Sequence, residues 1–323
     1  MRQLQTRMRR AVCLMLCPAL ATMAMRPVQA QERPRGDLVV FNAGSLAKPF
    51  TDLLRAFKAK HPGVIPAQEN SGSLEAARKL TDLGKIPDVI GVADYGVIPK
   101  LLIPQHATWF ATFARNSMVL IYTDQSIGAS EINGQNWWQV LLRAGVRAGR
   151  ADPTLDPNGY RTLMAFQLAE KFYKQPGLAG RLERALPAKY IRPKEADLTA
   201  LVQAGELDYS WSYASIARTA GLRHVKLPPE VDLSDPKLTD WYAQARVRIP
   251  GSRRTGGDSV EFRGEPIVYA LTIPTAAPHP GTAQAFVRFI FSPEGQAILK
   301  DNGFVVLEKP LLGGPGRPPE GLF

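Results

Sequence analysis

Short runs of apolar residues alternate along most of the chain with longer segments in which apolar residues recur every three or four positions. The short runs are typical of strands buried on both faces, and they lie at Leu38–Phe41, Asp88–Val92, Met118–Tyr122, Leu207–Tyr213 and Ile267–Ile273. The longer segments predict amphipathic helices over about Leu46–Lys60, Leu74–Leu83, Thr162–Tyr173, Thr282–Phe291 and Pro293–Asn302. Such alternation indicates an α/β fold, in which parallel sheets carry helices on both faces.

One segment departs from this alternation. Residues 253–258, with the sequence RRTGGD, predict the exposed tip of a hairpin between strands at Ala245–Ile249 and Val260–Phe262. The whole chain has 323 residues. With about 150 residues per domain as a guide, that length is enough for two lobes.

The first 30 residues are typical of an export signal. Arginines at positions 2, 7, 9 and 10 precede the apolar stretch Ala11–Met25, and Val28-Gln29-Ala30 supplies a small-x-small cleavage site. The apolar stretch is shorter than the roughly 20 residues of a membrane-spanning helix, so we expect cleavage after residue 30 and a periplasmic protein. No small residue directly precedes Cys13 or Cys17, which argues against a lipoprotein and leaves the mature chain without cysteine.

The basic charge of the chain is concentrated in this leader. The formal net charge of +11 falls to +6 for residues 31–323, because the first 30 residues contain five arginines and no acid. A high isoelectric point is a feature of nucleic-acid-binding proteins, but the exported chain has no dense block of Lys and Arg. We therefore expect a solvated basic surface and no nucleic-acid partner, with a mild positive field that would attract an anionic ligand.

No catalytic motif stands out. The chain has no Gly-x-Ser-x-Gly elbow and no Gly-x-x-x-x-Gly-Lys phosphate loop, and its four histidines are scattered at positions 61, 106, 224 and 279. The scattered histidines also argue against a zinc site. We expect a protein that is not an enzyme and needs no cofactor; an exported serine hydrolase is the alternative, but no base accompanies any candidate serine.

Serines follow two of the predicted strands at the point where a helix begins. Ser45 ends one strand-to-helix loop, and Ser71 or Ser73 ends another. A helix N-terminus offers free N–H donors and a partial positive charge, so it binds anions without Lys or Arg, and Gly44 and Gly72 would let the backbone approach a ligand closely. The alternative is that each serine only caps its own helix.

Two further segments carry candidate ligand groups. Asp152–Arg161 contains two Asp-Pro turns directly before a predicted helix, a pattern that predicts a rigid loop with outward-facing amides. The strand Leu207–Tyr213 ends in Ser212 and Tyr213, whose hydroxyls could face a cleft. Tyr213 could equally be a packed ring with a satisfied hydroxyl.

Several of these segments together resemble the tungstate/molybdate-binding proteins of ABC importers. The similarity runs in order over about residues 38–303. The matching segments are Phe41–Leu46, Ser71–Ser73, Ala93–Tyr95, Ile98–Lys100, Phe113–Leu120, Asp156–Arg161, Leu227–Glu230 and Ile267–Tyr269. The resemblance implies a receptor that captures molybdate or tungstate and delivers the oxyanion to a membrane permease, with sulfate or phosphate as the alternative ligand.

The resemblance also implies a two-lobed periplasmic-binding-protein fold of type II, in which each lobe is a mostly parallel sheet flanked by helices. Lobe 1 would comprise residues 31–120 and 214–323, lobe 2 would comprise residues 121–213, and the ligand would lie in the cleft between them. A hinge near residues 120 and 214 would close the lobes on the ligand. The protein is expected to act as a monomer.

Within that family, the positions of Ser45 and Ser73 would donate to the oxyanion, with Gly44 and Gly72 supporting the approach of the backbone. The loop around Asp156 and Asn158, together with Ser212 and Tyr213, would complete the site from the other lobe. The family can also supply two carboxylates that ligate the metal directly; one matches Asp156, and the other falls on position 212, which is Ser. We therefore expect a tetrahedral oxyanion held mainly by hydrogen bonds, with Asp156 as at most a weak ligand to Mo or W.

Overall fold

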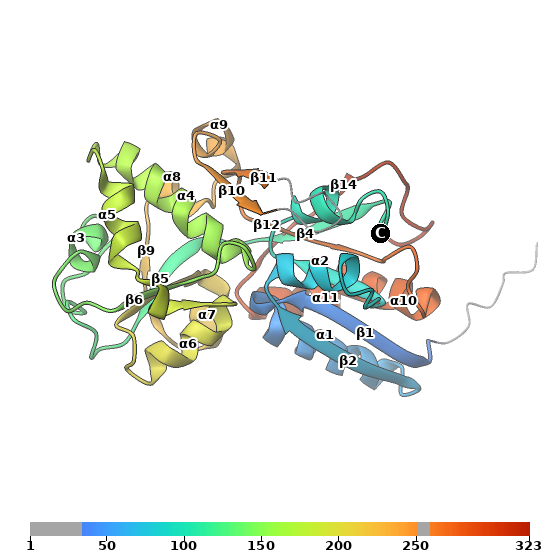
Figure 1. The fold of residues 1–323 in the computed structure, drawn as a ribbon. Helices are drawn as coiled ribbons and strands as arrows, with labels where there is room; N and C mark the ends of the chain where they lie inside the picture. Colours follow the sequence, from blue (N-terminus) through green and yellow to red (C-terminus); the bar gives the residue numbers. More distant parts are fainter. Residues whose placement is uncertain (1–33, 251–258) are drawn as a thin grey trace, which may run out of the picture. The chain divides into compact units, whose positions relative to one another are not determined.

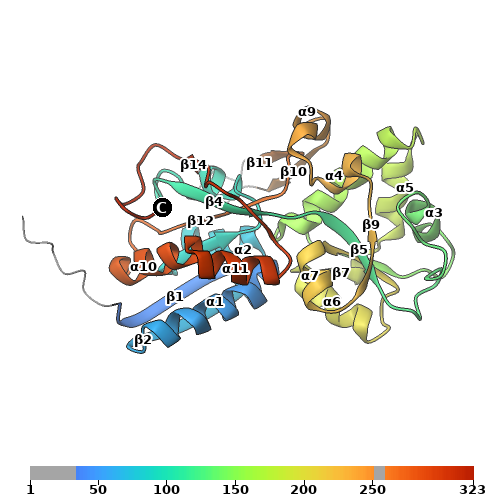
Figure 2. The same cartoon turned by 180° about the vertical axis from the view of Figure 1, so that it is seen from behind.

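The computed structural model describes residues 34–250 and 259–323, which form two sheets and a two-stranded hairpin flanked by helices (Figures 1 and 2). The predicted export signal and the hairpin tip at 253–258 lie outside the described residues. The predicted hairpin strands are present as β10 (Arg246–Pro250) and β11 (Ser259–Arg263). Among the described helices, none is both long and apolar enough to cross a membrane.

The first sheet has the strand order β13-β4-β12-β3-β1-β2, with β14 also paired to β4. Its strands are β1 (Gly36–Ala43), β2 (Val64–Ser71), β3 (Val89–Val92), β4 (Phe110–Arg115), β12 (Val268–Thr272), β13 (Val305–Val306) and β14 (Leu312–Gly313). Strand β1 is parallel to both β2 and β3, and Ala43 at its end pairs with Ser71 at the end of β2. The loops that follow these two strands therefore start side by side.

The second sheet has the order β7-β6-β8-β5-β9. Its strands are β5 (Met118–Tyr122), β6 (Ala148–Ala151), β7 (Ile191–Arg192), β8 (Tyr209–Tyr213) and β9 (Arg223–Lys226). In this sheet only β5 runs against the other strands. In the first sheet β12 is reversed, along with the two-residue strands β13 and β14. The predicted α/β fold is thus confirmed, but both sheets are mixed and not mostly parallel, because each pairing of the reversed strands β5, β12, β13 and β14 is antiparallel. The reversed strands β5 and β12 are those through which the chain passes between the sheets.

The chain enters the second sheet through a nearly continuous strand, because only Asn116 and Ser117 separate β4 from β5. It leaves later than residue 213, because β9 still pairs with β5. The division into lobes at residues 120 and 213 stays a prediction, and the pairing of β9 places a further strand after residue 213 in the second sheet.

All five predicted helices are present, within a few residues of their expected ends. The helices and helical turns are η1 (Gly44–Leu46), α1 (Ala47–Lys60), α2 (Ser73–Thr81), η2 (Ile98–Leu102), α3 (Trp137–Leu141), α4 (Pro157–Phe172), α5 (Leu178–Ala185), η3 (Ala188–Tyr190), α6 (Glu195–Gln203), α7 (Ala214–Thr219), α8 (Pro229–Asp232), η4 (Pro236–Leu238), α9 (Thr239–Tyr242), α10 (Pro280–Phe291) and α11 (Pro293–Asp301). Helix α2 packs on β1 and β3, whereas α1, α10 and α11 pack against one another. Helices α2 and α11 lie on the sides of the first sheet seen in Figures 1 and 2 respectively.

Alternation along β5 assigns the two faces of the second sheet. Met118 and Leu120 belong to the main core, which also holds Met164 and Phe166 of α4, whereas Val119 and Ile121 pack with apolar residues of α6. Successive side chains of a strand point to opposite faces, so α4 and α6 cover opposite sides of this sheet. The same alternation applies to β8, where Trp211 and Tyr213 lie in the α4-side core and Ser212 faces the side of α6.

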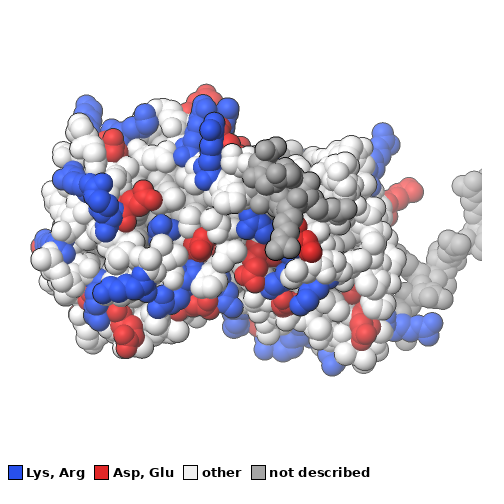
Figure 3. All heavy atoms as spheres, viewed as in Figure 1, with Lys and Arg blue, Asp and Glu red and all other residues white. Residues whose placement is uncertain are grey.

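The charged surface is mixed. On the face drawn in Figure 3, Lys and Arg side chains lie scattered among Asp and Glu. Surface ion pairs of this kind contribute little to stability individually, and interspersed charges keep the local field weak.

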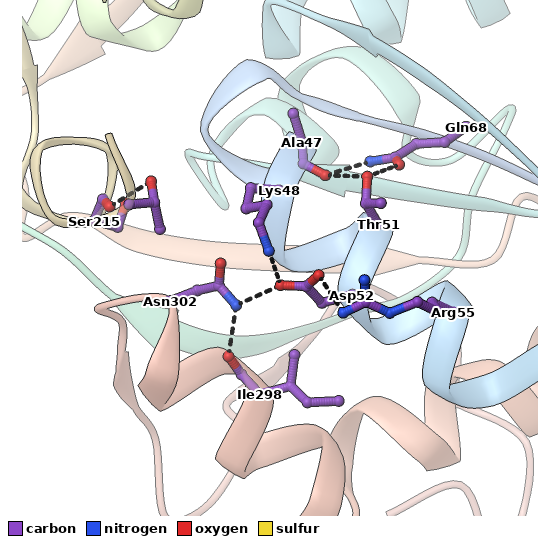
Figure 4. Close-up of polar contacts among 10 residues, drawn as sticks. Ala47, Lys48, Thr51, Asp52, Arg55, Gln68, Ser215, Ile298 and Asn302 are labelled. Carbon is purple, nitrogen blue, oxygen red and sulfur yellow. Dashed lines mark hydrogen bonds and ion pairs between the residues drawn. The ribbon is translucent and has the colours of Figure 1, made fainter. Parts of the chain in front are cut away.

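A polar network fixes the position of α1 relative to its neighbours (Figure 4). Asp52 accepts a hydrogen bond from Asn302 Nδ2 at 3.2 Å and is flanked on its own helix by Lys48 and Arg55. Burial by itself raises the pKa of Asp52, but the hydrogen bonds from Lys48 and Asn302 and the two cations lower it overall. At the start of α1, Gln68 Nε2 of β2 donates to the Ala47 carbonyl oxygen at 3.0 Å. These contacts hold the first turn of α1, and with it η1, against β2 and α11.

Candidate functional site

Two strand-to-helix junctions of the first sheet meet at one edge. Ser45 lies in η1 after β1, and Ser73 is the first residue of α2 after β2. Ser45 Oγ accepts a hydrogen bond from Tyr269 Oη at 2.9 Å, and Ser73 Oγ accepts one from Ala93 N at 2.9 Å. Neither serine is the N-cap of its helix, so the simple capping alternative does not hold. Each hydroxyl accepts one bond and keeps its proton free to donate.

The loop before α4 lies directly against the start of α2. The Leu155 carbonyl oxygen accepts hydrogen bonds from Leu74 N and Glu75 N, both at 3.2 Å. A Cβ atom on Gly72 would lie 2.1 Å from that same oxygen. Because the backbone of Gly72 has an ordinary extended conformation, φ −65° and ψ 149°, glycine is needed here for space and not for its dihedral angles. The contact brings the N-termini of α2 and α4 together.

Asp156 is the N-cap of α4, which begins at Pro157, so residues 157–161 are helical where a rigid loop was predicted. Its Oδ1 accepts a hydrogen bond from Asn158 N at 2.8 Å, which is an ordinary cap geometry. The side chain is 2% exposed, and its Oδ2 has no hydrogen-bond partner among the described residues. Burial raises the pKa of Asp156 well above its usual value, and the nearby Glu195 carboxylate raises it further.

Tyr213 reaches the site from the α4 side of the second sheet. Its hydroxyl accepts a hydrogen bond from Arg161 Nη1 at 3.0 Å, and the same guanidinium donates to the Ala93 carbonyl at 2.8 Å and pairs with Asp94 at 3.3 Å. Burial raises the pKa of Tyr213, so the phenol keeps its proton as a donor. Arg161 also faces desolvation, which lowers its pKa, but Tyr213 and Asp94 raise it overall. The guanidinium is therefore a fixed cation behind the hydroxyl.

Glu195 is a site residue that the sequence reading missed. It is the first residue of α6 and is 1% exposed. A Cβ atom on Gly44 would lie 3.5 Å from Glu195 Oε1 and 3.6 Å from Oε2, so the carboxylate faces the η1 loop. Its sequence neighbourhood, Lys194-Glu195-Ala196-Asp197, is that of an ordinary exposed first helical turn. Only the tertiary structure places this carboxylate beside Gly44 and Asp156.

Buried polar atoms without a hydrogen-bond partner concentrate in these segments. Within residues 34–250 and 259–323 they include Ser71 Oγ, Asp156 Oδ2, Asn158 Oδ1 and Nδ2, Glu195 Oε1 and Oε2, and Ser212 Oγ. Each such atom costs about 1–3 kcal/mol when it is left unpaired, and polar atoms this well buried are normally satisfied. A polar ligand that both accepts from hydroxyls and amides and tolerates two carboxyl groups would explain the set.

The structure thus brings together most of the predicted site residues. Gly44, next to Ser45, lies against Glu195, and Gly72, next to Ser73, lies against Leu155, next to Asp156. Arg161 connects Tyr213 to the carbonyl oxygen of Ala93, and Tyr213 is close enough to Asp156 and Glu195 to be influenced by their charges. Ser212 lies on the opposite face of β8 from Tyr213, toward α6, and its hydroxyl makes no hydrogen bond within the described chain. The same part of the chain contains no group of three or more His, Cys, Asp or Glu side chains that could hold a metal cation.

Two sheets joined by crossing strands, with helix N-termini and unpaired polar groups gathered where their loops meet, define a binding protein for a small polar solute. The chain belongs to the bacterial extracellular solute-binding protein family, whose model matches residues 38–305. Membership of this family implies a periplasmic or extracellular location. The molybdate/tungstate-binding protein WtpA of Pyrococcus abyssi is 34% identical over 303 residues, which cover 86% of each protein.

Solved structures share the fold. The sulfate-binding protein SubI of Mycobacterium tuberculosis superposes with a TM-score of 0.60 at 15% identity, covering 85% of this chain and 88% of that one. The periplasmic molybdate-binding protein of Azotobacter vinelandii gives a TM-score of 0.61 at 17% identity, covering 84% of this chain and all of that one. At these identities the similarity shows the fold alone, which is the two-lobed type II fold of periplasmic binding proteins.

Replacing Gly72 by Ala should damage the junction between α2 and α4. The added Cβ atom would lie 2.1 Å from the Leu155 carbonyl oxygen, which must move and weaken its bonds to Leu74 N and Glu75 N. We expect a loss of about 1–3 kcal/mol in the free energy of unfolding, measured by urea denaturation. Gly281→Ala in α10 is the control, because its Cβ atom has open space and should be neutral or stabilising. Equal behaviour of the two variants would show that the contact is not tight.

The raised pKa of Asp156 predicts a pH dependence of stability. The native state holds this proton more tightly than the unfolded state, so the free energy of unfolding falls as pH rises from the unfolded-state pKa toward the native one. Without added oxyanion, Asp156→Asn should therefore gain stability relative to the unchanged protein as pH rises above about 4, the ordinary pKa of an Asp carboxyl. The measurement is urea denaturation at a series of pH values above that point.

The control for this experiment is Asp235→Asn, which makes the same replacement at the half-buried cap of η4, where Oδ1 also accepts a backbone hydrogen bond. It separates the effect of a buried carboxyl from that of changing a cap residue. A stability difference between Asp156→Asn and the unchanged protein that stays constant with pH would contradict the prediction.

Proposed function

We propose that this protein is an extracytoplasmic receptor that captures molybdate or tungstate and delivers it to the permease of an ABC importer. The observation that carries the proposal is the cluster of buried, unpartnered polar atoms at the meeting point of η1, α2, α4, α6 and β8. The 34% identity to a molybdate/tungstate-binding protein over most of both chains supports this choice of ligand.

The donor set suits a tetrahedral oxyanion. Hydroxyl groups of Ser45, Ser73 and Tyr213 each accept one hydrogen bond within the protein and keep a proton to donate. The N-termini of α2 and α4 contribute a partial positive charge in the same place, while Leu74 N, Glu75 N and Asn158 N already donate to Leu155 and Asp156. The four oxygens of the anion accept these bonds, so no Lys or Arg has to touch it.

The full proposed site follows from these contacts. Ser45, Ser73, Asp156, Ser212 and Tyr213 would contact the oxyanion, while Gly44, Gly72 and Asn158 shape the loops around it. Asp156 is also the candidate direct ligand to Mo or W. The two lobes would close around the ligand by a hinge at the crossing strands. We further propose that the mature protein is a periplasmic monomer released after residue 30, without catalytic activity or a cofactor.

Sulfate is the less favoured alternative. Sulfate, molybdate and tungstate are all dianions at neutral pH, so the buried carboxyl groups of Asp156 and Glu195 oppose each of them. The sulfur of sulfate does not accept a carboxylate oxygen as a further ligand, whereas the larger Mo and W atoms do. Phosphate still carries a proton that it can donate to a carboxylate, which makes it the more compatible of the two alternatives. The shared fold does not separate these ligands, because sulfate-binding and molybdate-binding structures match this chain equally well.

Isothermal titration of the mature chain, stripped of ligand, tests the proposal directly. Molybdate, tungstate, sulfate and phosphate are titrated in parallel under identical conditions. We expect sub-micromolar binding of molybdate and tungstate and much weaker binding of sulfate and phosphate. Tight binding of sulfate or phosphate, or no binding of any of the four, would contradict the proposal.

A single substitution tests whether the oxyanion binds at the junction between β2 and α2. Ser73→Ala removes one hydroxyl donor, and we expect molybdate affinity to fall about tenfold to a hundredfold, as for the loss of one hydrogen bond to a charged group. Ser234→Ala, which changes a serine away from these junctions, is the matched control. If both variants keep the original affinity, the oxyanion binds elsewhere.

A further inference from the structure

The second sheet places residue 212 and the start of α6 on the same side. Ser212 points away from the α4-side core that holds Tyr213, and therefore toward α6. Helix α6 precedes β8 in the chain and packs on it. In such a unit the helix runs back along the strand, so the first residue of α6, Glu195, lies near the end of β8 that carries Ser212.

The carboxylate of Glu195 is buried with no cation beside it among residues 34–250 and 259–323, and its close neighbour is the carboxyl group of Asp156. It is 1% exposed, and both of its oxygens lack a hydrogen-bond partner within the described residues. Favourable interaction with its own helix dipole is worth only about 0.3–1 kcal/mol, whereas an unpaired buried charge costs considerably more. The adjacent Lys194 pairs with Asp197 instead. The buried cation Arg161 is already engaged by Ala93, Asp94 and Tyr213.

Glu195 also faces the loops of the proposed site. Its two oxygens lie 3.5 and 3.6 Å from the position of a Cβ atom on Gly44, and a longer side chain at residue 44 would be forced against them. The closeness of Asp156 is evident from the effect of Glu195 on its carboxyl. Three carboxyl oxygens, one of Asp156 and two of Glu195, are therefore buried at one place, and within the described residues no donor other than the neighbouring carboxyl pair itself reaches them.

We propose that Glu195 is a specificity-determining residue that contacts the bound oxyanion and, together with Asp156, rejects sulfate. This inference rests on the proposed function, because it assigns a role within that same site. The central atom of tungstate or molybdate is large and Lewis acidic, and it accepts further oxygen ligands from carboxylates. The sulfur of sulfate does not. Coordination forms metal–oxygen bonds, the proton held by Asp156 is released to water, no oxo group leaves, and the metal is neither oxidised nor reduced.

Glu195 thereby supplies a carboxylate on the side of β8 where Ser212 has only a hydroxyl. This differs from the expectation drawn from the sequence, in which the serine at position 212 left Asp156 as the one candidate carboxylate. The two positions approach from the same face of the second sheet, one from the end of β8 and the other from the start of α6. A side chain on α6 can therefore meet a ligand that β8 presents.

The test replaces Glu195 by Gln, which keeps the size of the side chain and removes its charge. Tungstate and sulfate are each titrated into the unchanged mature protein and into the variant. We expect Glu195→Gln to bind tungstate at least about tenfold more weakly and sulfate more tightly, so that the selectivity ratio falls. Asp197→Asn is the matched control, since it neutralises a half-exposed carboxylate in the same helical turn and should change neither affinity.

The two proposals fail in different ways. If the unchanged protein binds neither tungstate nor molybdate, both the proposed function and the proposed role of Glu195 are wrong. If it binds tungstate with selectivity over sulfate and Glu195→Gln keeps that selectivity, only the role of Glu195 is overturned.

A second variant and a second measurement guard against a misfolded Gln protein. Restoring a carboxylate from β8, in Glu195→Gln combined with Ser212→Glu, should recover selectivity for tungstate. X-ray absorption of bound tungstate should show more than four oxygen neighbours in the unchanged protein and one fewer in Glu195→Gln. Four oxygen neighbours in both proteins would overturn the proposal.

Discussion

The contact between Gly72 and the Leu155 carbonyl oxygen is the constraint on which the site depends. That oxygen occupies the space of a side chain at residue 72 and accepts from two amides of the first turn of α2. It therefore fixes the start of α4, and with it Asp156 and Arg161, against the start of α2. Helix α2 begins at the strand end that is paired with the end of β1. This one close backbone contact therefore fixes the positions of hydrogen-bond donors from both sheets relative to one another. Any residue other than glycine at position 72 would separate them.

The alternation of side chains along β8 then places neighbouring polar groups on opposite faces of the second sheet. In β8, Tyr213 points to the α4 side, where Arg161 holds its hydroxyl, and Ser212 points to the α6 side. Adjacent residues of one strand thus serve two different surroundings, a cationic one and a carboxylate-lined one. Helices α4 and α6, on opposite faces of the sheet, bring their N-terminal residues Asp156 and Glu195 within electrostatic reach of each other at the strand end.

The sequence predicted the fold class and the strand-end residues because those follow from local rules. Apolar runs mark strands, glycine and serine after a strand mark a helix start, and the ends of parallel strands meet at one edge. Among the described strands, β2, β4, β6, β7, β9, β13 and β14 escaped detection. For two of them the reason is equally local: β2 carries polar residues and Pro66, and β6, with the sequence AGRA, has no apolar run. Glu195 escaped for the opposite reason, since its local pattern is that of a solvated helix start and only packing buries it.

A site made of hydroxyls and backbone amides binds every tetrahedral oxyanion by the same bonds, so its donors cannot by themselves choose among them. A cation in contact with the anion would strengthen all of them alike. Arg161 does not supply that contact through its assigned bonds, because they go to protein oxygens. Discrimination therefore has to come from groups that some oxyanions tolerate and others do not. Buried carboxyl groups are such groups. When ionised they repel a dianion, and that repulsion is relieved by an anion that brings a proton or whose central atom accepts a carboxylate oxygen.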